Sequence, residues 1–482
     1  MSIWETVIGL EVHVQLLTKS KMFCGCSATF GDPPNTNVCP VCLGLPGALP
    51  VPNEHAVRLA VRAAFGLGLS VHPRSVFARK NYFYPDLPKG YQISQHTEPL
   101  ATGGHLDIES AERGGVSVGI TRIHVEEDAA KSFHDKVPGM TAVDFNRCGV
   151  PLIEVVGAPD LRSPAEARAY LTALKQVLLY LEVSDCSMEE GSLRVDANVS
   201  VRPAASTELR TRSEIKNLNS FANVERALAF ERDRHIAAYE SGGAVEQRTM
   251  AFDAATGEVR PMRSKEECQD YRYFPEPDLP PLVLAGDWLA AERTALPELP
   301  AAKRARFERA LGLSRSDARV LAGTRALAAH FEAVVGAGCA PKDAANWVMN
   351  DVLALGHGGE KLAVGAAATV GAIRLVKAGK VSRQNGRRLL AELAGRAFPD
   401  PAAAAGAAEA AAAKLGVLQV SDSGEIDGWV REVLDALPGE VERYRGGEAK
   451  VLGFLVGQVL QQSKGRADPK LVNAALLAAL KG

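Results

Sequence analysis

Apolar and polar residues alternate along several short segments within the first 290 residues. In the segment TVIGLEVHVQL, Glu11, His13 and Gln15 stand between regularly spaced apolar residues. A period of two predicts a β-strand with one apolar and one polar face. The same alternation predicts strands in three further segments, VGITRIHVEED, GSLRVDANVSVRP and RTRSEIKNL.

Helical spacing occurs between these predicted strands. The segment SPAEARAYLTALKQVLLYLEV starts with Ser163, a residue suited to cap a helix, and Glu166 follows three residues later. Strands and helices do not alternate regularly, so the pattern predicts an α+β fold with a mixed or antiparallel sheet.

The pattern changes after the proline-rich segment FPEPDLPPL at 274–282, beyond which helical spacing dominates. An alanine-rich, proline-bounded segment at 398–416 predicts a connecting helix. Ile426, Val430 and Val433 predict another helix, ended by Pro438 and Gly439. We therefore expect a catalytic domain at 1–294, an all-α helical domain at 295–408 and a small all-α tail domain at 409–482.

Composition adds little to this outline. A chain of 482 residues with 46% hydrophobic and 23% charged residues suits about three ordinary globular domains. The net charge of −2 requires any contact with nucleic acid to come from a local basic patch. No secretory signal and no apolar run of about 18 residues is visible, so we expect a cytoplasmic location and no membrane contact.

Cysteine spacing indicates a metal site. Cys24 and Cys26 are followed by Cys39 and Cys42. Two close pairs of thiolates suit tetrahedral Zn²⁺, and four sulfur ligands would make the metal structural. The other cysteines are isolated, and we expect them to be buried thiols: Cys148, Cys186, Cys268 and Cys339.

The polar strand faces carry residues that suit chemistry. His124 and Glu126 share one strand face, and Glu127 lies on the opposite face. A second strand has Arg194, Asp196 and Asn198 on one face, and a third has Arg212, Glu214 and Lys216. For any one strand, a solvated face is sufficient explanation. Together these residues favour a Mg²⁺ site that acts on an anionic substrate. The familiar glycine-rich nucleotide loops are absent, and the pattern alone names no reaction.

Several long motifs follow one another in order from residue 5 to residue 473. They include ETVIGLEVHVQL, NTNVCPVCLGLPGALPVPN, RKNYFYPDLPKGYQISQ, ITRIHVEEDAAKS, DFNRCGVPLIEVV, MEEGSLRVDANVSVRP, MRSKEECQDYRYFPEPDLPPL and GFLVGQVLQQSKGRADPKLVN. Together they resemble one family, the B subunits of the tRNA-dependent amidotransferase complex GatCAB.

The resemblance implies an activity and a set of partners. Members of this family act on Asp-tRNA(Asn) or Glu-tRNA(Gln), phosphorylate the side-chain carboxylate with ATP and Mg²⁺, and complete the amide with ammonia. The ammonia comes from a glutaminase A subunit, and the complex is braced by a small C subunit. The implied architecture is a cradle-shaped catalytic domain, a helical domain and a tail that contacts tRNA.

The resemblance also suggests roles for individual residues. For the Mg²⁺ site it implies Glu11, His13, Glu126 and Glu214, with Glu127 weaker because alternation points it away. For phosphate or substrate contacts it offers Lys80, Tyr82, Asn146 and Arg147, and Asp196, Asn198 and Lys216 complete the pocket. For each of the phosphate, substrate and pocket residues, a hydrogen bond or ion pair within the fold is an equally good explanation.

Two C-terminal segments, 371–397 and 443–482, have an excess of basic residues. For the first, ordinary helix surface is an equally good explanation. In the second, the motif QQSKGRADPK favours tRNA contact through Lys464, Arg466 and Lys470, by shape rather than by base sequence. The alternative from another class is a zinc-containing tRNA-binding module whose partners hold all the enzymatic activity.

Overall fold

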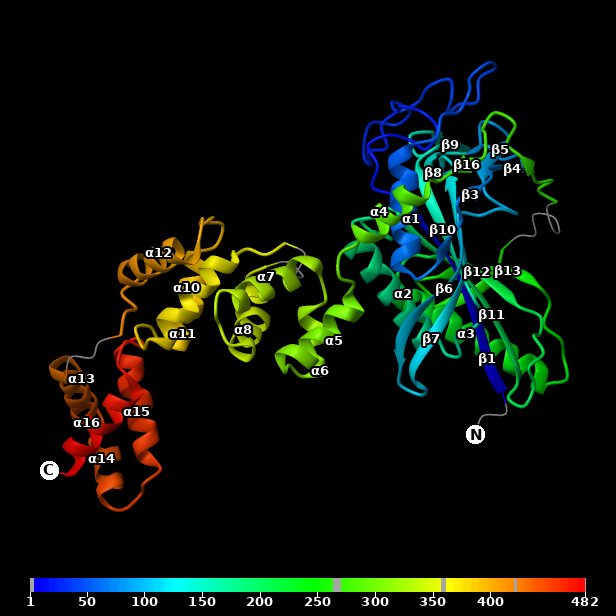
Figure 1. The fold of residues 1–482 in the computed structure, drawn as a ribbon. Coiled ribbons are helices and arrows are strands. Elements are labelled where there is room, and N and C mark those ends of the chain that lie inside the picture. The colour runs from blue at the N-terminus through cyan, green and yellow to red at the C-terminus, as the bar shows by residue number, and fades with distance from the viewer. Residues whose placement is uncertain (1–3, 263–269, 357–360, 420–422, 482) are drawn as a thin grey trace. The chain divides into compact units, whose positions relative to one another are not determined.

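The computed structural model describes residues 4–262, 270–356, 361–419 and 423–481, and Cys268 lies outside these ranges. The chain divides into two compact units, Met1–Leu299 and Pro300–Gly482. All of the long strands lie in the first unit, and the second is built of helices (Figure 1). Residue 408 lies inside a helix of the second unit, and the three-domain division stays a prediction.

The first unit is organised around a nine-stranded mixed sheet in its described residues, with the order β14-β13-β12-β11-β1-β10-β7-β6-β2. Neighbouring strands are antiparallel except β12 and β13, which are parallel. The strands are β1 (Trp4–Gln15), β2 (Ser70–Val71), β6 (Ala101–Ser110), β7 (Gly114–Glu127), β10 (Pro151–Gly157), β11 (Leu193–Pro203), β12 (Ser213–Leu218), β13 (Arg248–Asp253) and β14 (Glu258–Pro261). The four strands predicted from alternation are therefore confirmed.

The two faces of this sheet differ as the alternation predicts. On β1, Leu10, Val12 and Val14 are buried in one core together with three helices, which pack along this face (Figure 1). These helices are α1 (Glu54–Gly66), α2 (Pro164–Tyr180) and α3 (Phe221–Glu240), and α4 (Gly286–Thr294) packs on α1. Apolar burial on this face leaves the polar residues of the same strands on the opposite face.

Shorter strands surround the main sheet. A three-stranded sheet has the order β15-β4-β5, and two-stranded pairs join β16 to β3 and β8 to β9. Their bounds are β3 (Arg74–Ser75), β4 (Ala78–Asn81), β5 (Tyr91–Ser94), β8 (Lys131–Val137), β9 (Met140–Asp144), β15 (Phe274–Pro275) and β16 (Leu282–Val283). β5 contacts β7, so the three-stranded sheet adjoins the polar face near Glu126.

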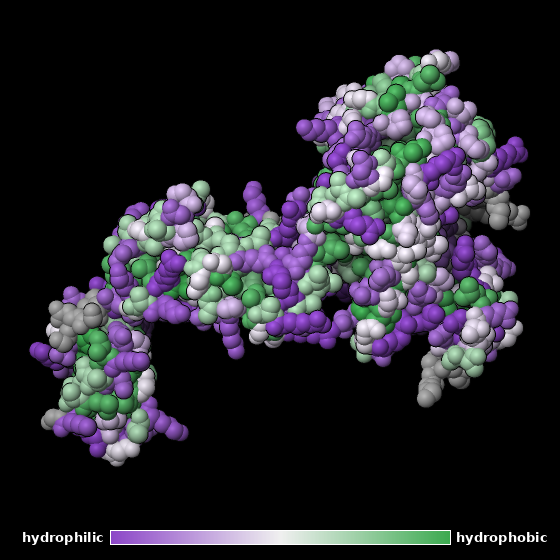
Figure 2. All heavy atoms as spheres, in the orientation of Figure 1, coloured by the Kyte–Doolittle hydropathy of each residue, from purple (hydrophilic) through white to green (hydrophobic). Residues whose placement is uncertain are grey.

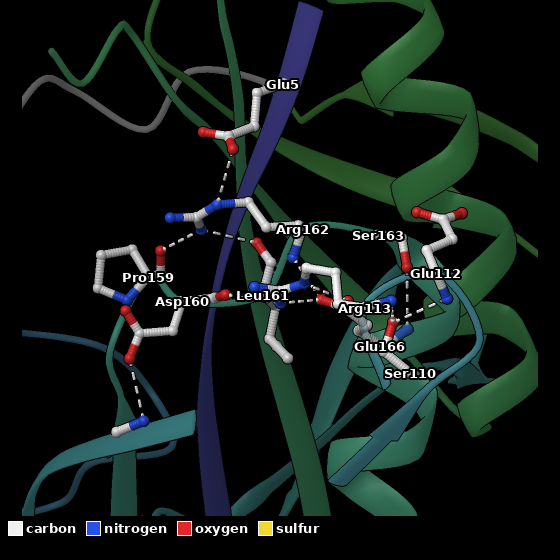
Figure 3. A network of polar contacts seen from close by, with 11 residues as sticks. Glu5, Ser110, Glu112, Arg113, Pro159, Asp160, Leu161, Arg162, Ser163 and Glu166 are labelled. Carbon is white, nitrogen blue, oxygen red and sulfur yellow. Dashed lines mark hydrogen bonds and ion pairs between the residues drawn. The ribbon is translucent and has the colours of Figure 1, made fainter. Parts of the chain in front are cut away.

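The start of α2 is held by a buried carboxylate (Figure 3). Ser163 accepts a hydrogen bond from the Glu166 N–H, which confirms the predicted cap. The Glu166 carboxylate accepts from Arg113 Nε at 2.7 Å and from the backbone N–H of Arg162 at 2.7 Å. Because Arg113 lies in the turn between β6 and β7, this network fixes α2 against that hairpin.

The second unit contains only helices among its described elements. They are α5 (Pro300–Leu311), α6 (Arg315–Leu321), α7 (Arg325–Gly336), α8 (Pro341–Trp347), the π-helix η1 (Val348–Val352), α9 (Leu353–Leu355), α10 (Ala366–Lys377), α11 (Arg383–Glu392), α12 (Pro401–Lys414), α13 (Ser423–Ala436), α14 (Pro438–Arg445), α15 (Val451–Gln462) and α16 (Pro469–Lys481). One core spans α5 to α12 and a smaller one spans α13 to α16.

The predicted helices of this unit are present. The alanine-rich segment forms α12, capped by Asp400, whose carboxylate accepts from the Ala403 N–H. Pro438 follows the end of α13, as expected, and it also begins α14, because proline is well tolerated in the first turn of a helix.

The α+β fold class followed by helical elements is confirmed. On the face shown in Figure 2, hydrophilic residues are interspersed with small apolar patches in both units. Within the described ranges, no helix combines the length and the apolar character that crossing a bilayer requires.

Candidate active site

The polar strand faces identified from the sequence meet on one face of the nine-stranded sheet. His13 on β1 pairs in register with Glu154 on β10 and with Arg194 on β11, and Glu154 pairs in turn with His124 on β7. One step along β1, Glu11 pairs with Asp196. Residues from five adjacent strands, β7, β10, β1, β11 and β12, thus point to the same side.

At the centre are two histidines between two carboxylates. His13 Nε2 lies 3.7 Å from Glu126 Oε1 and 3.5 Å from Glu154 Oε2. His124 Nε2 lies 3.5 Å from Glu126 Oε2 and 3.0 Å from Glu154 Oε2. Ser94 Oγ donates to Glu126 Oε2 at 2.9 Å. Ligand atoms of His13, Glu126 and Glu154 all lie within 4.8 Å of one another.

We name His13, His124, Glu126 and Glu154 the quartet. The charge of each of these four side chains depends on the other three. Burial disfavours the imidazolium form of His124, but Glu126 and Glu154 outweigh burial and raise its pKa to about 9. The pKa of Glu154 is lowered, because contacts with the two histidines outweigh the effect of burial, and that of Glu126 is lowered in the same way. The cluster therefore holds ionised carboxylates in a largely buried setting.

A second group of carboxylates adjoins the quartet. Asn198 Nδ2 donates to Glu11 Oε1 at 3.2 Å, and Lys216 Nζ lies 3.1 Å from oxygens of both Asp196 and Glu214. Burial and the nearby negative charges of Glu154, Asp196 and Glu214 raise the pKa of Glu11. This excess of negative charge around Glu11 would be relieved by a bound cation.

Lys80 and Tyr82 lie near the quartet. The Lys80 Nζ lies 4.8 Å from the centre of the Tyr271 ring. Burial opposes the charged form of Lys80, but the carboxylates of Glu126 and Glu154 and the neighbouring Tyr271 and Tyr273 raise its pKa. Burial, followed by the charges of Asp86 and Glu126, raises the pKa of Tyr82. Lys80 is thus a cation within electrostatic range of the carboxylates.

Glu127 lies outside the quartet, on the opposite side of β7 from Glu126, as alternation predicts. Its carboxylate forms an ion pair with Lys89 and accepts a hydrogen bond from the Ile93 N–H at 3.0 Å. The next residue, Asp128, is buried and accepts from Gln15 Nε2 at 2.7 Å, and it pairs with Arg194 at 2.8 Å. These contacts give both carboxylates partners within the fold.

Asn146 and Arg147 make internal contacts. Asn146 Nδ2 donates to the Pro33 carbonyl at 2.7 Å, and Asn146 Oδ1 accepts from the Asn37 N–H at 2.8 Å. Arg147 donates to the carbonyls of Ala129 and Ala130 at 2.9 and 2.7 Å. Both side chains therefore hold loops, which is the alternative that the sequence left open.

The four predicted zinc ligands converge. Sulfur atoms of Cys24, Cys26, Cys39 and Cys42 lie within 4.8 Å of one another. Contacts with Cys24, the Cys39 N–H and Lys21 outweigh burial and lower the pKa of Cys42 to about 4. Of the isolated cysteines, Cys148 and Cys186 are buried as predicted, whereas Cys339 is only half-buried.

Family models match most of the chain. The model described as "GatB/GatE catalytic domain" matches residues 6–290, and one described as "GatB domain" matches residues 329–480. The chain belongs to the GatB family. It is similar to the B subunits of aspartyl/glutamyl-tRNA(Asn/Gln) amidotransferases. The match to that of Geobacter sulfurreducens is 50% identical over 99% of this chain and 100% of the relative. For Chlorobaculum tepidum the identity is 48%, over 98% of both chains.

Membership of the GatB family confirms the resemblance seen in the motifs and the predicted enzyme class. The chain is a subunit of a tRNA-dependent amidotransferase, which is a ligase that forms a carbon–nitrogen bond. The match at 6–290 includes every residue of the quartet, so the polar sheet face lies within the region described as catalytic.

One central residue of the candidate active site was not predicted from the sequence. Glu154 stands alone in the apolar strand PLIEVVG, so alternation gave it no polar companion on its own strand. A lone carboxylate within an apolar strand was the available signal, because such a charge is rarely buried without a partner. His124 was placed on the correct face but was given no role.

The predicted tRNA contacts lie in the second unit. Lys464 and Lys470 are exposed, and the Arg466 guanidinium lies 5.2 Å from the centre of the Trp429 ring. In the other basic segment, Arg383 and Arg387 both pair with the buried Asp351 of η1, and Arg374 donates to the Ala337 carbonyl. Internal pairing thus favours ordinary helix surface for the segment 371–397.

Proposed function

We propose that the polar sheet face is the site at which ATP phosphorylates the side-chain carboxylate of an Asp or Glu residue carried by tRNA, and at which ammonia then forms the amide. The observation that supports this most strongly is the convergence of His13, Glu126 and Glu154 within the region matched by the catalytic-domain model. Two lysines are suited to hold phosphates: Lys80 lies within electrostatic range of Glu126 and Glu154, and Lys216 pairs with Asp196 and Glu214.

The side-chain carboxylate must first be activated, because direct attack by ammonia would have to expel an oxide ion, which is a very poor leaving group. A carboxylate oxygen attacks the γ-phosphorus of ATP, and ADP leaves. The nitrogen of ammonia then attacks the acyl carbon, the carbon–oxygen bond to phosphate breaks, and a proton is lost. The products are the amide, ADP and phosphate. The amino acid keeps its ester bond to the tRNA throughout.

The quartet fits a divalent cation, since three ligand atoms from imidazole and carboxylate groups converge in a largely buried position. We propose His13, Glu126 and Glu154 as the ligands of this cation. Glu11 and Glu214 are further acidic neighbours, and Glu127 is not a ligand. Bound Mg²⁺ would neutralise phosphate charge and align the reacting oxygens.

Other residues would shape the pocket around that centre. Lys80 on β4 and Tyr82 in the segment after it both lie within electrostatic range of Glu126, where a lysine can balance phosphate charge and a tyrosine can donate to an oxygen. Asp196 and Asn198 hold Lys216 and Glu11 in place. The internal contacts of Asn146 and Arg147 favour a supporting part for both residues.

A structural metal, partner chains and a cellular location complete the proposal. The four clustered cysteines fit a structural Zn²⁺, because four thiolates close a tetrahedral shell. We propose that the chain works in the cytoplasm with a glutaminase A subunit that supplies ammonia, a small C subunit, and the misacylated tRNA held in part by Lys464, Arg466 and Lys470.

The test is a conversion assay with the chain reconstituted with its A and C partners. We expect Asp-tRNA, Glu-tRNA or both to become the amide in the presence of ATP and glutamine. Glu126→Gln should abolish conversion, whereas the exposed control Glu112→Gln should leave it unchanged. A Glu126→Gln complex that converts at the wild-type rate would place the catalysis in the partners and make this chain a tRNA-binding module.

A further inference from the structure

A buried polar cluster lies on the opposite side of the sheet from the candidate active site. The buried stripe of α3 begins with the apolar residues Val224, Ala227 and Leu228, but it ends with Glu231 and His235, both fully buried. Facing them is Ser213, the first residue of β12 and also fully buried. We name Ser213, Glu231, Arg234 and His235 the α3 polar cluster.

The members of the α3 polar cluster contact each other closely. His235 Nε2 lies 2.9 Å from Ser213 Oγ and 3.1 Å from Glu231 Oε1. Arg234 donates to both Glu231 oxygens, at 2.6 and 3.0 Å. Burial raises the pKa of Glu231, but hydrogen bonds from His235 and Arg234 outweigh it and lower that pKa to about 2. The carboxylate is therefore ionised inside the core.

The strand held by this cluster carries two active-site residues. β12 has six residues, and Glu214 and Lys216 alternate with Ser213 and Ile215. Its pairing with β11 is interrupted by a register shift between Val195 and Ala197, opposite Asn217, which has a φ of 61°. The other neighbour, β13, is parallel. A strand this short and interrupted has few regular backbone hydrogen bonds to define its register, so the contacts of its buried side chains must contribute to it.

A change of register would be costly for the site. A slip of one residue would turn Glu214 and Lys216 towards α3 and would bring Ser213 and Ile215 to the polar face. The slip would also bury the charged Glu214 or Lys216 in the place of Ser213 or Ile215, which is costly without a partner. The α3 polar cluster adds to this cost, because moving Ser213 away breaks its 2.9 Å contact with His235, which also contacts the buried Glu231 carboxylate.

We propose that Glu231 and His235 are positioning residues that fix the register of β12 and thereby hold Glu214 and Lys216 at the active site. This inference rests on the proposed function, since it concerns the same site. A buried ionic cluster is weak evidence for stability, and a defined register is the better attested use of such groups.

The test uses the chain reconstituted with its A and C partners and compares three variants. His235→Leu removes the contacts with Ser213 and Glu231, and His235→Gln keeps an amide N–H to donate to Glu231. The control is His330→Leu, which removes a buried histidine bonded to Thr369 in the second unit. Melting temperature separates loss of folding from loss of position.

We expect His235→Leu to lower kcat for amide formation by roughly 10- to 100-fold, as a misplaced catalytic group does. The KM for aminoacyl-tRNA should stay unchanged, and His235→Gln should restore most of kcat. His330→Leu should keep kcat even where its melting temperature falls. A folded His235→Leu complex with wild-type kcat, or a His235→Gln complex no better than His235→Leu, would overturn the proposal.

Hydrogen exchange gives a second readout that needs no activity. Ser213→Ala is the milder variant, which should fold if His235→Leu does not. In either variant the amides of residues 213–218 should exchange faster, while those of β6 and β7 should not change. Unchanged protection of 213–218 would overturn the register proposal and leave the proposed function intact. Inactivity of the wild-type complex would instead count against the proposed function.

Discussion

At the scale of single residues, alternation predicted which side chains share a strand face, but not which strands lie side by side. Glu11 and His13 were singled out because they alternate with buried residues, and the structure places them beside Asp196 and Glu154. Glu154 has no such pattern, because its two neighbours on the same face are Leu152 and Val156. Its importance comes from the neighbouring strands, which no local pattern in a sequence reports.

The Glu166 carboxylate gives a prediction at this scale. Its pKa in the folded chain is about 2, because contacts with Arg113 and Arg162 outweigh the effect of burial, which raises it. Because this value is below the ordinary 4.5, Glu166 stabilises the fold above pH 4.5, and that contribution disappears as the pH falls towards 2.

We therefore expect Glu166→Gln to lower the free energy of unfolding by about 2 kcal/mol at pH 7 and to make little difference near pH 2. Urea unfolding followed by circular dichroism at pH 7, 5 and 3 measures this. The exposed Glu112→Gln on the same hairpin is the control. A deficit of the same size at every pH would contradict the linkage to ionisation.

At the scale of elements, the predictions that depend on periodicity succeeded. The four alternating strands, the helix capped by Ser163 and the alanine-rich helix are all present. Short elements such as β4 and β15, and the bulge in β12, were not predicted, because their geometry depends on partners distant in the sequence. The convergence of the four cysteines in the segment 24–42 was predicted from their spacing as metal ligands rather than from periodicity.

For the cysteine segment we expect about one tightly held Zn²⁺ per chain. Cys39→Ser should lose the metal and lower the melting temperature, because the remaining thiols cannot close a tetrahedral shell. Cys339→Ser, at a half-buried cysteine of the second unit, should keep it. Elemental analysis of freshly purified protein measures both, and a zinc-free wild type would remove the assignment.

At the scale of the whole molecule, sequence composition predicted no general attraction to nucleic acid, whereas the chain belongs to a family of tRNA-dependent amidotransferase subunits. The exposed Lys464 and Lys470 are suited to form a local basic patch in the second unit. Because such contacts bind phosphates, their effect depends on salt.

We expect the double variant Lys464→Ala/Lys470→Ala to raise the KM for aminoacyl-tRNA and to reduce the salt dependence of binding by a slope of about 2. Glutamine hydrolysis by the A partner and kcat at saturating tRNA should be unchanged. Arg431→Ala, an exposed basic residue elsewhere in the tail, is the control. An unchanged salt slope in the double variant would exclude these lysines from the contact.

The central claim is that the polar sheet face catalyses phosphorylation of a carboxylate on tRNA, and an isotope measurement tests it most directly. The side-chain carboxylate of the aminoacyl-tRNA is labelled with oxygen-18, and the phosphate released by the reconstituted complex is analysed by mass spectrometry. We predict one labelled oxygen in each phosphate for the wild type, and no labelled phosphate for Glu126→Gln. Unlabelled phosphate from an active wild-type complex, or labelled phosphate from Glu126→Gln at the wild-type rate, would contradict the account.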